Sequence, residues 1–229
     1  MAARLHALAI RTSTPEASLT FWEDLLGWSR QGAELDPGQE GAFRLVFEAS
    51  HEPRQGLNQI HVHLTSNSAP QAATVVRARE LGATHLDVGQ APEEDHVVLA
   101  DPDGNEFCVI EEGNSWLAGT GFLGELACDG TREVGVFWSE AIGWPLVWDE
   151  DGETAISPPG GGVKIAWGGP PLNERHGRSR MYVVLVADDL DAEVERLVHL
   201  GAAVVERREG EIGMTDPDGN EFRLRQQVF

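Results

Sequence analysis

The chain has 229 residues, 41% of them hydrophobic, and 38 acidic against 17 basic residues give it a net charge of −21. This length fits one large or two ordinary globular domains, and the negative charge argues against a nucleic-acid partner because phosphates are repelled. No apolar run matches a membrane span or a signal peptide, and two cysteines make no disulfide framework. We therefore expect a cytoplasmic protein with no membrane partner.

The first predicted helix covers residues 15–26 and has recognisable ends. Ser13 or Thr14 is the expected N-cap, Pro15 occupies the first helical position, and Gly27 is the expected stop. Apolar side chains recur inside this segment at helical spacing, so one face of the helix should be buried.

Strand-like segments surround this helix, and the pattern then starts again. The tetrapeptide DPDG at 101–104 predicts a type I turn between the last two strands of the first half. In chain order, the predicted strands cover 5–10, 28–34, 43–48, 60–64, 96–100 and 106–111, and a second helix covers 70–81. Each half of the chain is therefore expected to hold two strand–helix–strands units.

Three motifs occur twice, in the same order and at nearly constant spacing, which indicates a tandem duplication. We predict two homologous domains, residues 1–113 and 120–229, joined by a glycine-containing linker near 113–124. The repeated motifs are FWEDLLGW (21–28) and FWSEAIGW (137–144), LGA (81–83 and 200–202), and DPDGNEF (101–107 and 216–222).

Paired strand–helix–strands units that end in DPDGNEF resemble the vicinal oxygen chelate superfamily, which includes glyoxalase I, extradiol dioxygenases and bleomycin-resistance proteins. The resemblance covers the whole chain, with one match in each half. It implies an α+β fold of two tandem glyoxalase-like domains, each with two βαβββ modules that form a curved, mostly antiparallel eight-stranded sheet around a cavity. Function does not follow from this fold alone, because it serves lyases, dioxygenases, isomerases, transferases and binding proteins.

Enzymes of this superfamily hold a divalent metal on His, Gln and Glu side chains that project into the cavity. The position of the metal glutamate in the last strand is taken by Cys108 in the first half and by Arg223 in the second. The histidine position corresponds to His61 in the first half and to Tyr182 in the second. The second half therefore carries a degenerate metal site, since a guanidinium repels a cation.

In the first half, the resemblance implies a possible metal set of His6, Glu48, His61 and Cys108. These groups are chemically able to bind zinc, iron, nickel or manganese. His63 alternates with His61 on one strand and would then act as a catalytic proton shuttle. The alternative, which we favour because the expected carboxylate is missing, is that His61 and His63 are polar cavity residues that hydrogen-bond to a ligand.

Aromatic side chains are further candidates for ligand contact. Trp148 and Trp167 lie in strand-like segments expected to wall the second cavity, where their rings could stack on an aromatic or cationic ligand or simply fill the space. Tyr182 is included as the counterpart of His61. The acidic composition favours a cationic ligand over an anionic one.

Two hypotheses follow. The first is a binding protein of the bleomycin-resistance kind, which holds a small aromatic or cationic molecule without chemistry. The second is a metal-dependent lyase, isomerase or dioxygenase with an active first half and a degenerate second half. The sequence leaves open whether the modules pair within or between the halves, and whether the protein is a monomer or a homodimer.

Overall fold

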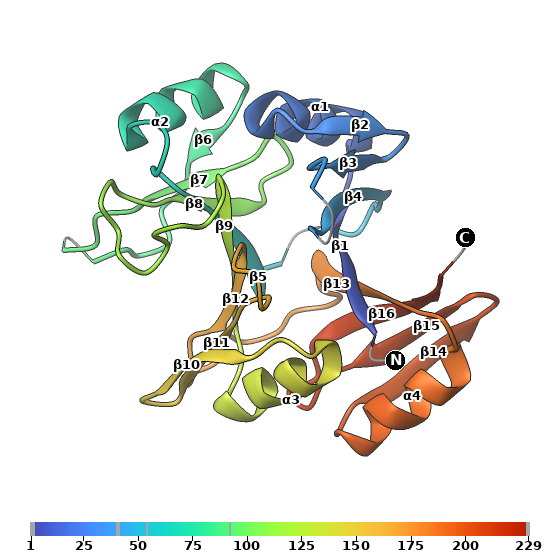
Figure 1. The fold of residues 1–229 in the computed structure, drawn as a ribbon. Helices are drawn as coiled ribbons and strands as arrows, with labels where there is room; N and C mark the ends of the chain where they lie inside the picture. Colours follow the sequence, from blue (N-terminus) through green and yellow to red (C-terminus); the bar gives the residue numbers. More distant parts are fainter. Residues whose placement is uncertain (1–2, 40–41, 54, 92, 228–229) are drawn as a thin grey trace.

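The computed structural model describes the whole chain except residues 1–2, 40–41, 54, 92 and 228–229, so the outer ends of the two expected domains lie outside the described residues. Its helices and strands follow one another as four βαβββ modules (Figure 1).

Module 1 comprises β1 (Arg4–Thr12), α1 (Pro15–Leu26), β2 (Ser29–Gln31), β3 (Glu34–Asp36) and β4 (Arg44–Ala49). Module 2 comprises β5 (Ile60–Leu64), α2 (Gln71–Glu80), β6 (Thr84–His85), β7 (Val97–Ala100) and β8 (Glu106–Val109). Module 3 comprises β9 (Leu123–Cys128), α3 (Arg132–Ile142), β10 (Leu146–Glu150), β11 (Glu153–Ile156) and β12 (Lys164–Trp167). Module 4 comprises β13 (Met181–Ala187), α4 (Leu190–His199), β14 (Ala203–Arg208), β15 (Glu211–Thr215) and β16 (Glu221–Gln226).

The modules form two eight-stranded sheets, and each sheet takes one module from each half of the chain. Sheet A joins modules 1 and 4 in the order β14-β15-β16-β13-β1-β4-β3-β2. Sheet B joins modules 2 and 3 in the order β10-β11-β12-β9-β5-β8-β7-β6. In Figure 1 the blue strand β1 accordingly runs beside the orange strand β13, where the two pair in antiparallel fashion.

The α+β fold with two mixed, mostly antiparallel eight-stranded sheets and four βαβββ modules is therefore confirmed. The pairing that the sequence left open occurs between the halves: β1 pairs with β13, and β5 pairs with β9. This pairing decides which candidate residues can lie close together, because the two modules of each half belong to different sheets. None of the helices in the described part of the chain is long and apolar enough to span a bilayer.

The first helix has the predicted limits, but its N-terminus is capped differently. α1 covers Pro15–Leu26 and ends at Gly27, which has the left-handed φ of 69° that glycine favours. Thr14 makes no side-chain cap to the helix, and Ser13 Oγ instead donates to Asp103 in the turn of module 2. The predicted side-chain N-cap is therefore wrong. The hydroxyl of Ser13 instead connects module 1 to module 2 through Asp103.

The segment predicted as one strand at 28–34 is instead the start of a hairpin. β2 and β3 are both short, and the turn between them contains Gly32 at a φ of 65°. The prediction missed the turn because a single glycine within an alternating segment carries little signal. The DPDG turn is confirmed, since Gly104 N donates to Asp101 O at 2.9 Å.

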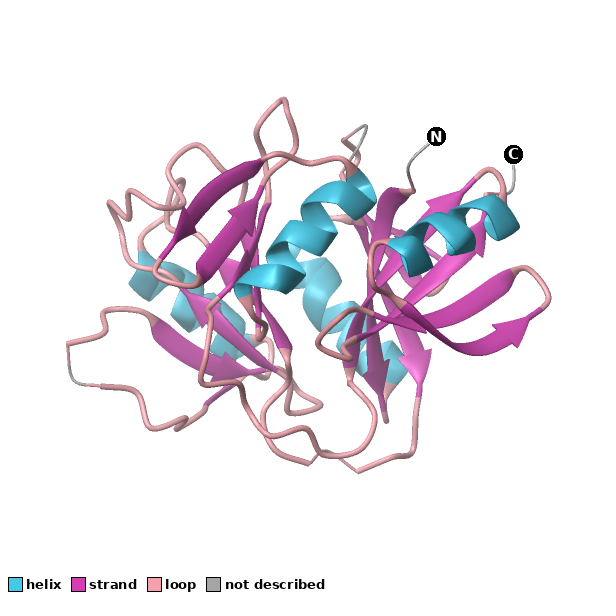
Figure 2. Cartoon of the chain, turned by 90° about the horizontal axis from the view of Figure 1, so that it is seen from below, coloured by secondary structure: helices cyan, strands magenta, loops and turns pink. Residues whose placement is uncertain are grey.

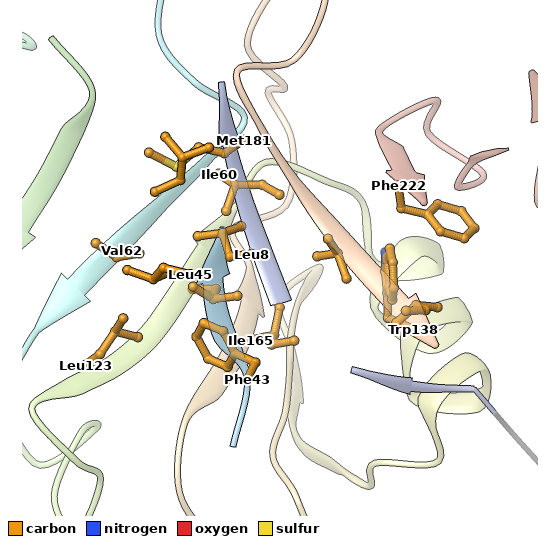
Figure 3. Close-up of a cluster of buried hydrophobic side chains, with 14 of the residues drawn as sticks. Leu8, Phe43, Leu45, Ile60, Val62, Leu123, Trp138, Ile165, Met181 and Phe222 are labelled. Carbon is orange, nitrogen blue, oxygen red and sulfur yellow. The ribbon is translucent and has the colours of Figure 1, made fainter. Parts of the chain in front are cut away.

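The two sheets share one hydrophobic core. Figure 2 shows two helices lying between the two groups of strands. Figure 3 shows Leu8 and Leu45 of sheet A beside Ile60 and Val62 of sheet B, and all four side chains are buried in the same cluster. The opposite face of each sheet is concave and carries its own small cluster of buried residues. We call these two faces cup A and cup B.

Candidate functional site

Cup B is crossed by a row of polar side chains contributed by four neighbouring strands. His63 of β5 lies opposite Cys108 of β8 on one side and Glu125 of β9 on the other. Glu125 in turn lies opposite Lys164 of β12. Residues directly opposite one another in paired strands project to the same face, so the strand register alone brings imidazole, thiol, carboxylate and ammonium groups together.

His63 is fixed by the carboxylate of Glu125. The His63 Nδ1 to Glu125 Oε2 distance is 2.7 Å, and the indole of Trp116 donates to the other carboxylate oxygen at 2.6 Å. Burial alone would lower the pKa of His63, but hydrogen bonds to Cys108 and Glu125 and their negative charge outweigh burial and raise it to about 9. At neutral pH His63 is therefore an imidazolium paired with a buried carboxylate.

His61 is the neutral partner of His63. The Nε2 atoms of the two rings are 3.0 Å apart. Burial, followed by the positive charges of His63 and His96, lowers the pKa of His61 to about 3. A neutral His61 can accept the hydrogen bond that protonated His63 donates. The two opposite pKa shifts therefore describe one pair of histidines that shares a single positive charge, and this charge resides on His63, whose two N–H groups point to Glu125 and His61.

The polar row opens onto a cavity of about 570 Å³. His61 and Glu125 reach its surface, and the rings of Trp116 and Trp148 form part of its wall, edge to face at 5.7 Å between centroids. Trp148 is 39% exposed, so its face is available to a guest. Lys164 Nζ lies 3.7 Å from the Trp116 ring centroid and donates to Trp116 O at 2.5 Å, which holds this indole in place.

The same residues offer a donor set that fits a divalent metal. One ligand atom each of His61, His63 and Cys108 lies within 4.8 Å of the others. With Glu125 at Nδ1 of His63, Nε2 is the nitrogen that would bind a metal in place of its proton and its hydrogen bond to His61, which is the carboxylate–histidine arrangement seen behind metal ligands. Two imidazoles and a thiolate suit zinc or iron, and three protein ligands leave a position for a substrate.

Cup A carries different side chains at the corresponding positions. Tyr182 stands in the place of His61, Val184 in that of His63, and Arg223 in that of Cys108. Arg223 forms an ion pair with Glu211, and Arg225 binds both Glu211 and Glu48. This network of opposite charges occupies the centre of cup A.

The structure divides the four sequence-predicted metal ligands between the two sheets. His61 and Cys108 lie in cup B with His63, whereas Glu48 lies in sheet A, where it accepts a hydrogen bond from Tyr182 Oη. His6 lies on β1, also in sheet A, and lines a different cavity. The four are not brought together, because β1 and β4 pair with module 4 and not with module 2.

The predicted aromatic contacts also lie in different environments. Trp148 lines the cavity of cup B with an exposed ring. Trp167 borders the same cavity, but it is only 2% exposed and packs into the shared core. Tyr182 is fully buried in cup A, beneath the guanidinium of Arg11.

Sequence reasoning missed three residues of this site: Glu125, Trp116 and Lys164. Glu125 is a lone carboxylate within an apolar strand, which is itself a signal of a buried partner. Trp116 lies in the segment predicted as a linker, which the structure folds against cup B. Lys164 is the only lysine of the chain.

Comparison with known proteins agrees with this architecture. A family model described as a glyoxalase-like domain matches the chain twice, at residues 7–110 and 125–225. Glyoxalase I from Zea mays has a similar structure, with 14% identity, a TM-score of 0.67, and coverage of 98% of this chain and 92% of the maize chain. A candidate dioxygenase from Bacillus subtilis is also similar, with 14% identity, a TM-score of 0.62, and coverage of 98% and 85%. No curated protein sequence matches the chain.

Structural likeness at this identity concerns the fold alone, but the double family match covers most of the sequence. The chain therefore belongs to the glyoxalase-like domain family, within the vicinal oxygen chelate superfamily, and carries that domain in tandem.

Proposed function

We propose that this protein binds a small aromatic or cationic molecule in cup B. The observation that carries the proposal is the cavity of about 570 Å³, which places two indole rings beside a buried carboxylate. Such a volume fits a small ligand, and aromatic walls with a few fixed polar groups are typical of ligand sites. Trp148 would supply the stacking face, and the carboxylates of Asp129 and Glu153, which also line the cavity, would attract a positive charge on the guest.

The test uses benzyltrimethylammonium as an aromatic cation and benzoate as its anionic counterpart. We expect saturable quenching of tryptophan fluorescence by the cation, and weaker binding after Trp148→Ala. Val147→Ala is the matched control, because Val147 is the exposed neighbour of Trp148 on β10. Equal binding by both variants, or preference for benzoate, would contradict the proposal.

A second function, a metal-dependent lyase, isomerase or dioxygenase, is favoured by one specific observation. The donor atoms of His61, His63 and Cys108 lie within 4.8 Å of one another, and His61 lines the same cavity. Bound there, a divalent metal would supply Lewis-acid chemistry to substrate oxygens. Glu125 would orient His63, and His61 would present its Nε2 toward the cavity.

Cup A would be the degenerate site in either case. Its centre holds Arg223 and Arg225, whose guanidiniums stand where a cation would have to bind. This part of the proposal rests on charge: two guanidinium cations repel a metal ion, and Glu211 and Glu48 are already engaged with them.

Metal analysis separates the two functions. If the protein is a metal-dependent enzyme, we expect the purified protein to carry one zinc, iron, nickel or manganese ion per chain. The substitution His61→Ala should remove this ion. His199→Ala, at an exposed position on α4, is the control and should keep the metal. Protein that binds the aromatic cation but takes up none of these metals from solution would favour the binding function.

A further inference from the structure

A second cavity, of about 350 Å³, lies at the end of sheet A where β1 finishes and β13 begins. It is separate from the proposed ligand site, although both share the edge formed by Asn58 and Gln59. Its lining includes three arginines and a histidine, in a chain whose net charge is −21: Arg11, Arg178, Arg180 and His176. So many cations around one cavity call for a physical explanation in such an acidic protein.

Arg11 is buried against several partners and has an unused donor at Nη2. Its side chain is 7% exposed, and its guanidinium lies 4.3 Å from the centroid of the Tyr182 ring. Nη1 donates to Ser179 O and lies 3.0 Å from Glu221. Nη2 is buried, and within the described part of the chain it has no hydrogen-bond partner. A buried donor without a partner costs about 1–3 kcal/mol, so this one is expected to have a partner in the working protein.

Arg180 shows the same feature from the facing strand. Its Nη2 binds Asp103, whereas its Nε is buried and has no partner among the described residues. Arg11 of β1 and Arg180, which directly precedes β13, thus line one cavity, and each carries one unsatisfied donor. Neither apolar nor cationic guests can accept from these groups, because only an acceptor satisfies a guanidinium N–H.

Carboxylates around the cavity do not saturate its arginines. Glu221 is shared by Arg11, at 3.0 Å, and Arg178, at 3.7 Å. Glu221 itself is not part of the cavity lining, in which Glu52 is the acidic residue among those described. The side chain of Arg178 is 46% exposed, and its contact with Glu221 is the longer of the two. The guanidinium of Arg178 can therefore turn toward a guest in the cavity.

The corresponding end of cup B has the opposite charge. Arg11 is two residues beyond Ala9, which pairs with Tyr182, and Asp129 is two residues beyond Ala127, which pairs with His61. The duplicated scaffold therefore places a cation at this position in sheet A and an anion in sheet B. This contrast is expected if the two ends receive guests of opposite charge.

We propose that the cavity bordered by Arg11, Arg178 and Arg180 binds a small oxyanion, a carboxylate or a phosphate group. Such a group would accept hydrogen bonds from Arg178 directly and from the two buried guanidiniums after a small rotation, and planar guanidinium forks match its oxygens. The site goes beyond the function proposed for cup B and does not depend on it.

The test titrates inorganic phosphate and acetate into the protein at constant ionic strength, with chloride as the reference anion. We expect a saturable rise in the thermal midpoint with at least one of the two oxyanions, and a shift of the Arg180 Nε resonance in the same titration. The oxyanion that acts identifies the chemical source of the guest. Arg178→Ala should weaken binding about tenfold, the loss expected for one charge-assisted hydrogen bond.

Arg207→Ala is the matched control, because Arg207 is also about half exposed and has a single distant ion pair, with Asp191 at 3.6 Å. It should leave binding unchanged. Equal weakening by both variants would show general charge screening and overturn the proposal. So would a thermal midpoint and an Arg180 Nε resonance that move no more with phosphate or acetate than with chloride.

Discussion

Trp22 donates a hydrogen bond from its indole nitrogen to Asp101 Oδ2 at 3.1 Å, and Trp138 makes the same bond to Asp216 at the same distance. The repeated motif that begins with Phe-Trp therefore binds the repeated motif DPDGNEF in each half. Each tryptophan also packs its ring against the phenylalanine of the following NEF segment, at 5.2 Å between centroids. These contacts join the two modules of one half, whereas the sheets join modules of different halves. Both motifs are repeated because each half needs the same joint.

Replacing Trp22 with phenylalanine tests this joint. The variant keeps an aromatic ring but removes the donor to Asp101, a buried carboxylate that also accepts from the backbone of Asp103 and Asn105. We expect a loss of about 1–3 kcal/mol in the free energy of unfolding, measured by denaturant titration. Trp28→Phe is the control, since Trp28 is half-buried and packs against Phe43 without such a carboxylate. A Trp22→Phe loss no larger than that of the control would show that the bond contributes little.

The proton held by His63 gives a stability that depends on pH. Its folded pKa of about 9 lies above the ordinary value of 6.5, so the folded state binds the proton more tightly than the unfolded state. The resulting stabilisation is fully present below pH 6.5 and is lost as pH rises from 6.5 to 9. Because burial opposes the shift, removing the Glu125 carboxylate should lower the pKa of His63.

NMR titration of the imidazole resonances in chelator-treated protein measures this pKa. Glu125→Gln should move the His63 transition down by at least one pH unit, and its stability deficit should be largest below pH 6.5. Glu153→Gln changes an exposed carboxylate that borders the same cavity and should leave the transition in place. An unchanged His63 transition in Glu125→Gln would remove the carboxylate as its cause.

Local signals and the duplication predicted most of the fold. Pro15 and Gly27 mark the limits of α1, because both residues have restricted or unusual backbone preferences that act locally. The pairing of β1 with β13 was not predictable, since the apolar alternation of β1 suits either neighbouring module equally well. Strand order between modules depends on how whole surfaces pack, and no residue within the strand specifies it.

The candidate site was predicted in part, for the same reason. His61, His63 and Cys108 lie on strands of one module, so their proximity followed from the first half alone. Glu125 belongs to the other half, and it reaches His63 only because β9 pairs with β5. Trp116 reaches the site from an irregular segment, whose path no periodicity describes.

Cys108 should decide which metal cup B takes, if it takes one. A thiolate beside two imidazoles favours zinc over manganese, whereas a carboxylate favours the harder ion. Cys108→Asp is therefore expected to weaken zinc binding and to strengthen manganese binding, measured by competition with a chelating dye. Cys128→Ser is the control, because Cys128 lies outside the cluster of ligand atoms. An unaltered zinc affinity in Cys108→Asp would exclude the thiol as a ligand.

The charged centre of cup A should be important for stability. Arg223 and Glu211 have side chains that are 10% and 17% exposed, and their ion pair lies beside Tyr182. Arg223→Ala leaves Glu211 with Arg225 alone, and we expect a loss of about 1–3 kcal/mol in unfolding free energy. Arg208→Ala breaks an exposed pair with Glu206 and should cost less than about 1 kcal/mol. Similar losses in both variants would contradict a structural role for the buried network.

The contact between α3 and β11 allows a test of packing with a clear sign. Gly135 lies in α3, and a Cβ atom at this position would be 1.9 Å from Thr154 Oγ1. Alanine normally stabilises a helix by about 1 kcal/mol relative to glycine, but here the clash should dominate and make Gly135→Ala destabilising by about 1–3 kcal/mol. Thr154→Ala removes Oγ1, the atom nearest to the new Cβ, but keeps the Thr154 Cβ at 2.6 Å, so Gly135→Ala should cost less, though not nothing, in that background. A double-mutant cycle by denaturant unfolding measures this coupling. Additive effects of the two substitutions would show that the contact with Thr154 Oγ1 does not determine the cost of Gly135→Ala.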